Sequence, residues 1–268
     1  MKVNYFIPQT PYLSSIIHTV WESEGNTKFR NETIIPKGIV EIIFDLGDNA
    51  PVEVRLNSKE YSLGKCFING FNTFPIHLDL PSRQCYFGVQ FHPVALMILF
   101  GIPLREFSNH TVDLRLADTF FEYLWYQLVE KETFDQRVLV ITKWLENLSI
   151  EIPPQEKFLN NYLGAQFHAH TTVEALSKVL CYSPRHLSRK IYELTEMNTE
   201  EILLYKKYLH ATHLIHTTDF SLTEIAYQSK FSDQSHFIRS FKGYTQLTPG
   251  EYRKIKSQLP GHIFENVR

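Results

Sequence analysis

Apolar and polar residues alternate in the first third of the chain with the two-residue period of short β-strands. The run VEVRL, residues 52–56, alternates strictly, and IVEIIFDLG, residues 39–47, is a β-branched apolar run that follows a Pro-Lys-Gly turn. Three further short runs are CFING, PIHLDL and CYFGVQF, at residues 66–70, 75–80 and 85–91. Gly, Pro, Asn and Ser separate these runs, so the pattern predicts a small β-barrel or sandwich.

Apolar residues farther along the chain recur every three or four positions, which predicts helices at residues 116–132 and 134–148. Their apolar stripes are formed by Leu124, Leu128, Val138, Ile141 and Leu145. The short turn between them predicts a helical hairpin. Two roles stay open for this hairpin: it covers one face of the β-domain, or it forms a dimer interface.

The most apolar run, VALMILFGIPL at residues 94–104, is about half as long as a bilayer-spanning helix, and Gly101 and Pro103 interrupt it. We predict a buried helix there. The start of the chain lacks the apolar core and the cleavage site of a signal peptide. We therefore expect a soluble, cytoplasmic protein that does not contact a membrane.

An internal repeat of about 50 residues occupies the last third of the chain. TVEALSKVLCYSPRHLSRKI, residues 172–191, aligns with LTEIAYQSKFSDQSHFIRSF, residues 222–241. The offset is 49 residues before the central turn and 50 after it, as in the match of Arg189 with Arg239. Each copy predicts a helix, a tight turn and a second helix.

The predicted helices of the repeat begin at side chains that can accept a backbone hydrogen bond, as N-caps and capping boxes do. These start signals are Thr171 with Glu174, Ser183 with Pro184, Ser221 with Glu224, and Ser232 with Asp233.

The second helix of each copy has one apolar and one polar face. Leu187 and Ile191 in the first copy, and Phe237 and Phe241 in the second, lie one turn apart and are predicted to face the core. Arg, Gln and Ser on the opposite face suit the base edges of a major groove. The predicted base contacts are Arg185, Ser188, Arg189, Gln234, Ser235 and Arg239, and the predicted phosphate contacts are Lys190, His236 and Lys242.

The formal net charge of -2 is unevenly distributed. Residues 1–154 carry 13 Lys and Arg against 18 Asp and Glu, a net of -5, and residues 155–268 carry 14 against 11, a net of +3. A basic module can therefore follow an acidic one. The Pro-Pro pair in SIEIPPQ, residues 149–155, predicts a linker at 153–158 between domains at 1–152 and 159–268.

Residues 166–254 resemble the DNA-binding module of the AraC/XylS transcriptional regulators of bacteria. The most specific segment is SLTEIAYQSKFSDQSHFIRSFKGYTQLTPGEYRK, residues 221–254. Its matching motifs are Ile225-Ala226, Phe231-Ser232, Phe237-Ile238-Arg239-Ser240-Phe241-Lys242 and Thr248-Pro249-Gly250-Glu251-Tyr252-Arg253, and the first copy matches through Ser183-Pro184-Arg185-His186-Leu187-Ser188-Arg189.

The resemblance implies two helix-turn-helix units joined by a longer helix, which we place at residues 200–216. A helix of that length spans roughly 25 Å, which suits reading helices in successive major grooves. The chain departs from the family pattern at several positions: Cys181, Lys230 and Glu196 replace a usual Gly, Thr199 a usual Pro, and Lys207 a usual Arg. Because Gly is favoured at positive φ, we expect slightly strained or differently shaped turns.

The N-terminal half is similar to the regulatory half that precedes this module, a cupin-like β-barrel followed by two helices that can dimerise. The fold class implied is therefore two domains: an N-terminal, mostly β, cupin-like barrel with an α-helical hairpin, and an all-α C-terminal domain with two helix-turn-helix units. The expected function is sequence-specific DNA binding that regulates transcription through two helix-turn-helix units in adjacent major grooves; activator and repressor action both stay open. Promoter DNA is the expected partner, and the resemblance allows RNA polymerase, a second copy of the chain and an effector as others.

No enzyme signature is present in the sequence, and we expect neither catalysis nor a cofactor. His77, His92 and Glu41 lack the HxH spacing of a cupin metal site, and His168-Ala169-His170 lacks a third ligand, so no metal is expected. An effector pocket inside the barrel would be lined by Phe44, Phe67, Phe71, Tyr86 and Phe91, although an aromatic stripe on strands more often forms plain core. The alternative function is a sensor whose helical half mainly binds other proteins.

Overall fold

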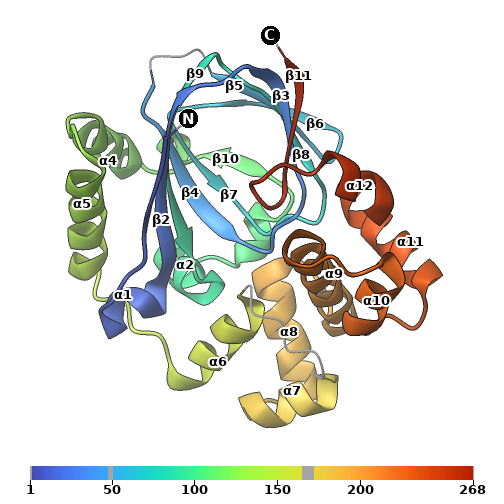
Figure 1. The fold of residues 1–268 in the computed structure, drawn as a ribbon. Helices are drawn as coiled ribbons and strands as arrows, with labels where there is room; N and C mark the ends of the chain where they lie inside the picture. Colours follow the sequence, from blue (N-terminus) through green and yellow to red (C-terminus); the bar gives the residue numbers. More distant parts are fainter. Residues whose placement is uncertain (1, 48–50, 165–171, 268) are drawn as a thin grey trace.

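A six-stranded antiparallel sheet forms one wall of the N-terminal region in the computed structural model, which describes residues 2–47, 51–164 and 172–267 (Figure 1). Its strand order is β1-β2-β9-β4-β7-β10. The strands are β1 (Lys2–Phe6), β2 (Ile17–Asn26), β4 (Val40–Asp45), β7 (Cys66–Asn69), β9 (Arg83–Phe91) and β10 (Thr111–Asp113).

A five-stranded sheet with the order β11-β3-β8-β5-β6 forms the other wall. Its strands are β3 (Phe29–Ile34), β5 (Val52–Leu56), β6 (Lys59–Leu63), β8 (Ile76–Asp79) and β11 (His262–Val267). Alternate residues of β5 are buried and exposed, as the pattern VEVRL predicts. The expectation of a mostly β N-terminal region is confirmed.

The predicted helical hairpin is formed by α4 and α5, and the predicted buried helix is α2. The helices of this region are α1 (Pro11–Ile16), α2 (Pro93–Phe100), the 3-10 helix η1 (Leu104–Phe107), α3 (Leu114–Ala117), α4 (Thr119–Val129) and α5 (Phe134–Asn147). All five residues of the predicted apolar stripes are buried. The indole of Trp125 in α4 donates to the carbonyl oxygen of Asp45 in β4 (2.7 Å), so the hairpin covers the β-region.

Seven helices follow in the described part of the chain: α6 (Pro154–Leu163), α7 (Val173–Leu180), α8 (Pro184–Thr195), α9 (Thr199–Thr217), α10 (Leu222–Gln228), α11 (Gln234–Thr245) and α12 (Pro249–Ile255). The joining helix predicted at residues 200–216 is α9, which begins with a capping box of Asn198 and Glu201. The expectation of a helical C-terminal region is confirmed. Among the described residues of this region, β11 is the one strand, and the sequence did not predict it.

The linker expected at residues 153–158 is mostly the first turn of α6. Pro154 occupies the first helical position, where a missing N–H costs nothing, so the Pro-Pro pair starts a helix instead of only ending one. Lys206 in α9 fixes the other end of α6, because its buried ammonium donates to the carbonyl oxygens of Leu163 (3.0 Å) and Gly164. Burial lowers the pKa of Lys206 to about 7.

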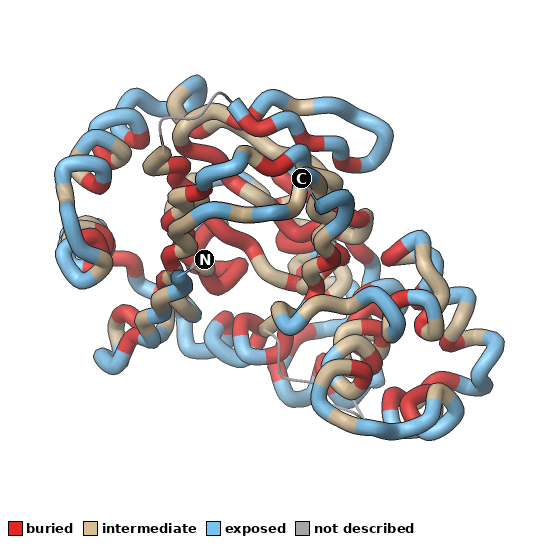
Figure 2. The backbone as a smooth tube through the Cα atoms, turned by 45° about the horizontal axis from the view of Figure 1, so that its top comes forward, coloured by how far each residue is buried: buried red, intermediate tan, exposed pale blue. Residues whose placement is uncertain are grey.

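One hydrophobic core runs through both regions, and Figure 2 shows its buried segments in red on both sides of the junction. Tyr205 and Tyr208 of α9 are fully buried. Their hydroxyls donate to the carbonyl oxygens of Asn72 and Pro36, both at 2.9 Å, in the β-region. Because these buried bonds cross the junction, α9 is part of the core as well as a connector.

Candidate nucleic-acid interface

The first helix-turn-helix unit consists of α7 and α8. Thr172 caps α7 by accepting a hydrogen bond from the amide of Ala175 (3.2 Å), whereas the predicted box of Thr171 and Glu174 begins outside the described residues. Ser183 caps α8, as predicted. Between the two helices Cys181 has φ 54°, which confirms that a residue other than Gly takes the left-handed conformation in this turn.

The second unit consists of α10 and α11. The predicted capping box of Ser221 and Glu224 is present, with bonds of 2.7 and 3.2 Å. Lys230 takes the left-handed conformation at φ 60°, in the position that corresponds to Cys181. The turn geometry is therefore repeated along with the sequence.

The prediction that Ser232 caps α11 is wrong. Asp233 is the N-cap, and its carboxylate accepts from the amide of His236 at 2.7 Å. A full negative charge interacts better than a hydroxyl with the positive end of a helix. That amide bond lowers the pKa of Asp233, and Ser232 instead bonds to the side chains of Asp233 (3.2 Å) and His236 (3.0 Å).

The second helices of the two units have the predicted inward and outward faces. The four apolar residues Leu187, Ile191, Phe237 and Phe241 are all fully buried. On the opposite faces Arg185, Arg189, Gln234, Ser235 and Arg239 are exposed, and Ser188 is half-buried. Thus α8 and α11 each present a polar face that includes Arg, as the base-contact prediction requires.

Two of the exposed side chains have neighbours on their own unit. The carboxylate of Glu193 lies 3.8 Å from Arg189 one turn along α8. The side-chain oxygen of Gln234 accepts from the hydroxyl of Thr223 in α10 (3.2 Å). Both contacts are at the surface, so they orient these side chains without removing them from solvent.

The three predicted phosphate contacts occupy different surroundings. Lys242 is exposed, and His236 is half-buried beside the ring of Phe231. Lys190 does not fit the prediction, because its ammonium forms a 2.9 Å ion pair with the buried carboxylate of Glu156 in α6. Glu156 also accepts from the hydroxyl of Tyr182 (3.1 Å), so it binds two residues of the first unit.

Glu156 is the residue that the sequence did not reveal. It lies 34 positions before Lys190, in a segment expected to be a linker, and no local periodicity connects the two. Only the packing of α6 against the first unit brings the charges together.

The five residues predicted to line an effector pocket divide between two core clusters. Phe44, Phe71 and Phe91 belong to the larger core cluster, whereas Phe67 and Tyr86 belong to a smaller one. The strand register explains the division: in the β4–β7 pair Phe44 lies opposite Cys66 and Phe67 opposite Ile43, so Phe44 and Phe67 point to opposite faces of the sheet.

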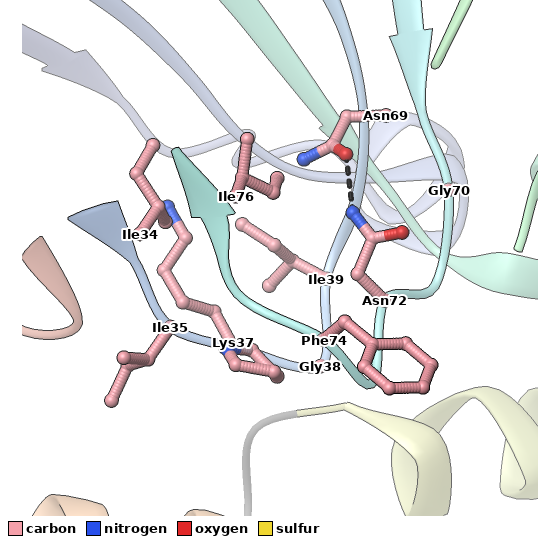
Figure 3. A pocket seen from close by; sticks show the side chains of 11 residues that line it. Ile34, Ile35, Lys37, Gly38, Ile39, Asn69, Gly70, Asn72, Phe74 and Ile76 are labelled. Atoms are coloured by element: carbon pink, nitrogen blue, oxygen red, sulfur yellow. Dashed lines mark hydrogen bonds between the residues drawn. The ribbon is translucent and has the colours of Figure 1, made fainter. Parts of the chain in front are cut away.

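A shallow hollow of about 250 Å³, part of it open solvent, lies at another place on the β-region (Figure 3). Asn72 donates to the side-chain oxygen of Asn69 (2.5 Å) on one side of it. Its lining is Ile34, Ile35, Pro36, Lys37, Gly38, Ile39, Asn69, Gly70, Asn72, Phe74 and Ile76. None of the five predicted aromatic residues lines this hollow.

The described residues contain no group of three or more His, Cys, Asp or Glu side chains that could hold a metal ion. Within them, His77 bonds to Thr33 (3.0 Å) and His92 to the carbonyl oxygen of Ser14 (3.1 Å). The His168-Ala169-His170 motif lies outside the described residues. Among the described helices, none has the length and apolar character needed to cross a membrane.

Two family models match different parts of the chain. A helix-turn-helix domain matches residues 176–255, and a domain of unknown function (DUF6597) matches residues 5–113. The first match covers the second unit and all but the start of the first, and the second match covers most of the β-region.

The chain is similar to bacterial helix-turn-helix regulators. It is 26% identical over 182 residues to the uncharacterized HTH-type transcriptional regulator YtdP of Bacillus subtilis (strain 168), which covers 60% of this chain and 23% of YtdP. It is 33% identical over 93 residues to the uncharacterized HTH-type transcriptional regulator SAS0078 of Staphylococcus aureus (strain MSSA476), which covers 35% of this chain and 12% of that protein. The chain thus spans less than a quarter of the length of these relatives.

The crystal structure of an apo ToxT variant from Vibrio cholerae strain SCE256 has a similar fold, with a TM-score of 0.50 and 12% sequence identity, over 89% of this chain and 98% of ToxT. The fold and the repeated unit therefore define a two-region helix-turn-helix protein. Residues 176–255 carry a helix-turn-helix domain, and the chain is similar to bacterial HTH-type transcriptional regulators, in line with the resemblance to the AraC/XylS family that its motifs carry.

Proposed function

We propose that the protein is a transcription factor that binds promoter DNA sequence-specifically, with α8 and α11 in adjacent major grooves. One observation carries the proposal. Two units with the same turn geometry each place a helix with exposed Arg, Gln or Ser side chains opposite a buried apolar pair. A surface helix displays polar residues in many proteins. Here the exposed polar face, the N-cap position and the turn are repeated, which is expected of two equivalent DNA-binding units.

The joining helix has a suitable length. With 19 residues, α9 spans about 28 Å at 1.5 Å per residue. Successive major grooves on one face of DNA are about 34 Å apart, and each reading helix adds its own offset from the end of α9. One copy of the chain could therefore read a site of about two helical turns.

The proposed base contacts are Arg185, Ser188 and Arg189 in one groove and Gln234, Ser235 and Arg239 in the next, with His236 and Lys242 on phosphates. Lys190 would reach a phosphate only if its pair with Glu156 opened. Residues 155–268 carry a net charge of +3 and residues 1–154 a net charge of -5, so the negatively charged DNA is attracted to the helical half of the chain.

The regulatory assignment of residues 1–152 and the DNA-binding assignment of residues 159–268 are part of this proposal. A second copy of the chain is a candidate partner, because α4 exposes Tyr123 and Tyr126 on the side away from its buried stripe. If this contact joins two copies, a Tyr123→Glu variant should shift the equilibrium towards monomer, which sedimentation of the variant and the wild type would measure. RNA polymerase and a small-molecule effector are further candidate partners, and no catalytic activity is proposed.

The central experiment measures binding of the full chain to DNA upstream of its own gene and to a scrambled duplex, over a range of salt. We expect a preference for the upstream DNA and affinity that falls steeply with salt. Arg239→Ala should reduce the preference by about 1–3 kcal/mol, as loss of a bidentate base contact does. An absence of DNA affinity at low salt would instead favour the alternative, a helical half that binds other proteins.

A further inference from the structure

The last described strand, β11, leaves the helix-turn-helix region and joins the sheet of the β-region. It pairs antiparallel with β3 from His262 opposite Ile34 to Val267 opposite Phe29. Figure 1 shows this strand in red, running from α12 back along β3. The segment that follows the second unit is therefore an integral strand of the opposite region.

Side-chain contacts reinforce the pairing of β11. Ile263 is buried, and the ring of Phe264 stacks on Phe29 at 5.3 Å between centroids. The amide of Ile35 donates to the carbonyl oxygen of Gly261 (2.9 Å), which extends the ladder by one bond. Backbone hydrogen bonds, apolar burial and ring stacking thus all stabilise the pairing of this short strand with β3.

His262 connects β11 to two charged residues of the β-region. Its Nε2 lies 3.1 Å from the ammonium of Lys37, and its Nδ1 lies 2.6 Å from the carboxylate of Glu32. Lysine has only donors, so Nε2 accepts and the Nδ1 hydrogen is donated to Glu32. A neutral imidazole therefore joins a cation to an anion across the strand pair.

The strand is coupled to the second reading helix through Tyr252 of α12. The Tyr252 hydroxyl accepts from the amide of Gly261 (3.2 Å) and bonds to His216 in α9 (2.7 Å). The Tyr252 ring contacts Phe241 of α11, with 5.6 Å between centroids. Any displacement of α11 relative to the β-region therefore disturbs β11.

The first unit is attached to the β-region side of the molecule elsewhere. The helix α8 packs against η1 and α2, where the Arg105 guanidinium lies 5.2 Å from the centre of the Tyr192 ring. Entry of two helices into successive grooves requires the units to adjust to the DNA and to each other. Separate anchors resist that adjustment, and the acidic β-region held beside the units repels phosphates.

We propose that β11 is an autoinhibitory clasp: while paired with β3 it holds α12 and α11 against the β-region, in addition to the buried contacts of α9, and it is released when the protein binds DNA. The proposal rests on the DNA-binding function proposed above. Release exposes β3 as an edge strand and frees α12 and α11 to move together. By linkage, DNA and the paired strand compete, so each weakens the other.

Two variants of the full chain test the clasp, with a matched control. Ile263→Asp places a charge in the buried interface of β11, and deletion of residues 262–268 removes the strand. Val267→Asp puts the same charge on the exposed end of the strand. We expect the first two to bind the upstream DNA at least about fivefold more tightly than wild type, and Val267→Asp to bind nearly as wild type.

Hydrogen exchange on the unmodified chain gives a test that does not depend on the folding of a variant. Addition of the upstream DNA should accelerate exchange of the β3 amides that pair with β11, while α10 and α11 stay protected. Unchanged β3 exchange on saturation with DNA, or unchanged or weaker DNA affinity of a folded Ile263→Asp variant, would overturn the clasp. A wild-type chain that binds no DNA at low salt would overturn the proposed function itself.

Discussion

In the first unit the inward side chains of α8 are Leu187 and Ile191, whereas in the second unit Phe237 and Phe241 occupy the same two positions of α11. The second unit consequently has an aromatic core. Phe241 lies 5.5 Å from Tyr208 and 5.6 Å from Tyr252 between ring centroids. The same face of the helix is buried in both units, but the buried side chains are aliphatic in the first unit and aromatic in the second.

The attachments of the units differ more than their cores. The first unit is held by Glu156, whose carboxylate binds Lys190 and Tyr182, and the second is held by a β-strand. The first attachment depends on a buried ion pair and the second on backbone hydrogen bonds between strands. The two units are therefore held to the rest of the molecule by contacts of different kinds.

The largest expected effect comes from truncating the inward residues. Phe237→Ala should lower the free energy of unfolding by about 3–5 kcal/mol, because a fully buried ring leaves a cavity among aromatic neighbours. Leu187→Ala, at the matching position of α8, should cost about 2–5 kcal/mol. Urea unfolding measures both, and a cost below about 1 kcal/mol for Phe237→Ala would refute the aromatic core as its main support.

The buried Lys206 should make the junction beside the first unit sensitive to pH. Its pKa is about 7 in the folded protein and 10.5 ordinarily, so between these values the unfolded state binds more protons. The free energy of unfolding should therefore rise with pH over this range, by at most about 1.4 kcal/mol per pH unit from this group.

A Lys206→Met variant keeps the apolar stem without the titrating group. Urea unfolding at about pH 7.5 and about pH 9.5 should show a smaller rise for the variant than for wild type. Equal rises in the two proteins would mean that Lys206 keeps its charge up to the higher pH, so that burial does not lower its pKa.

The salt dependence of DNA binding should distinguish the lysines of the two units. Lys242→Ala should reduce the slope of log affinity against log salt by about 0.9, the value for one lost phosphate contact. Lys190→Ala should leave the slope unchanged, because Glu156 holds its ammonium. A reduced slope for Lys190→Ala would show that this ion pair opens on DNA.

The smallest expected effects concern the two turns. Cys181→Gly should stabilise the protein by about 0.5–1 kcal/mol, because glycine adopts positive φ without the strain of a Cβ atom. Lys230→Gly should gain less, because the Lys230 ammonium lies 5.3 Å from the centre of the Tyr227 ring and that contact is lost. Thermal unfolding against Cys181→Ala and Lys230→Ala controls would detect these differences, and a loss of stability in Cys181→Gly would count against strain in the turn.

Features fixed by neighbouring residues could be predicted from the sequence. The five strand runs, α4, α5 and the cap at Ser221 follow from periodicity and start signals within a few residues, whereas α9 was placed from the family resemblance. The choice between Ser232 and Asp233 as the cap of α11 was missed, because adjacent residues of both types can cap a helix.

Features fixed by distant contacts could not be predicted. The strand β11 pairs with a segment more than 220 residues earlier, and its six residues carry no strict alternation. The pair of Lys190 with Glu156 and the division of the barrel aromatics between two clusters likewise depend on packing and register. The contacts of Glu156 and β11 set how the two helix-turn-helix units are held, whereas the polar faces of α8 and α11 were evident from the repeat.

A hydroxyl-radical footprint of the full chain on the DNA upstream of its gene tests most directly whether both units read DNA. We predict two protected segments on one face of the duplex, about one helical turn apart. Arg239→Ala should weaken one segment and Arg189→Ala the other. A single protected segment, or one pattern of loss for both variants, would contradict a protein that reads two successive grooves.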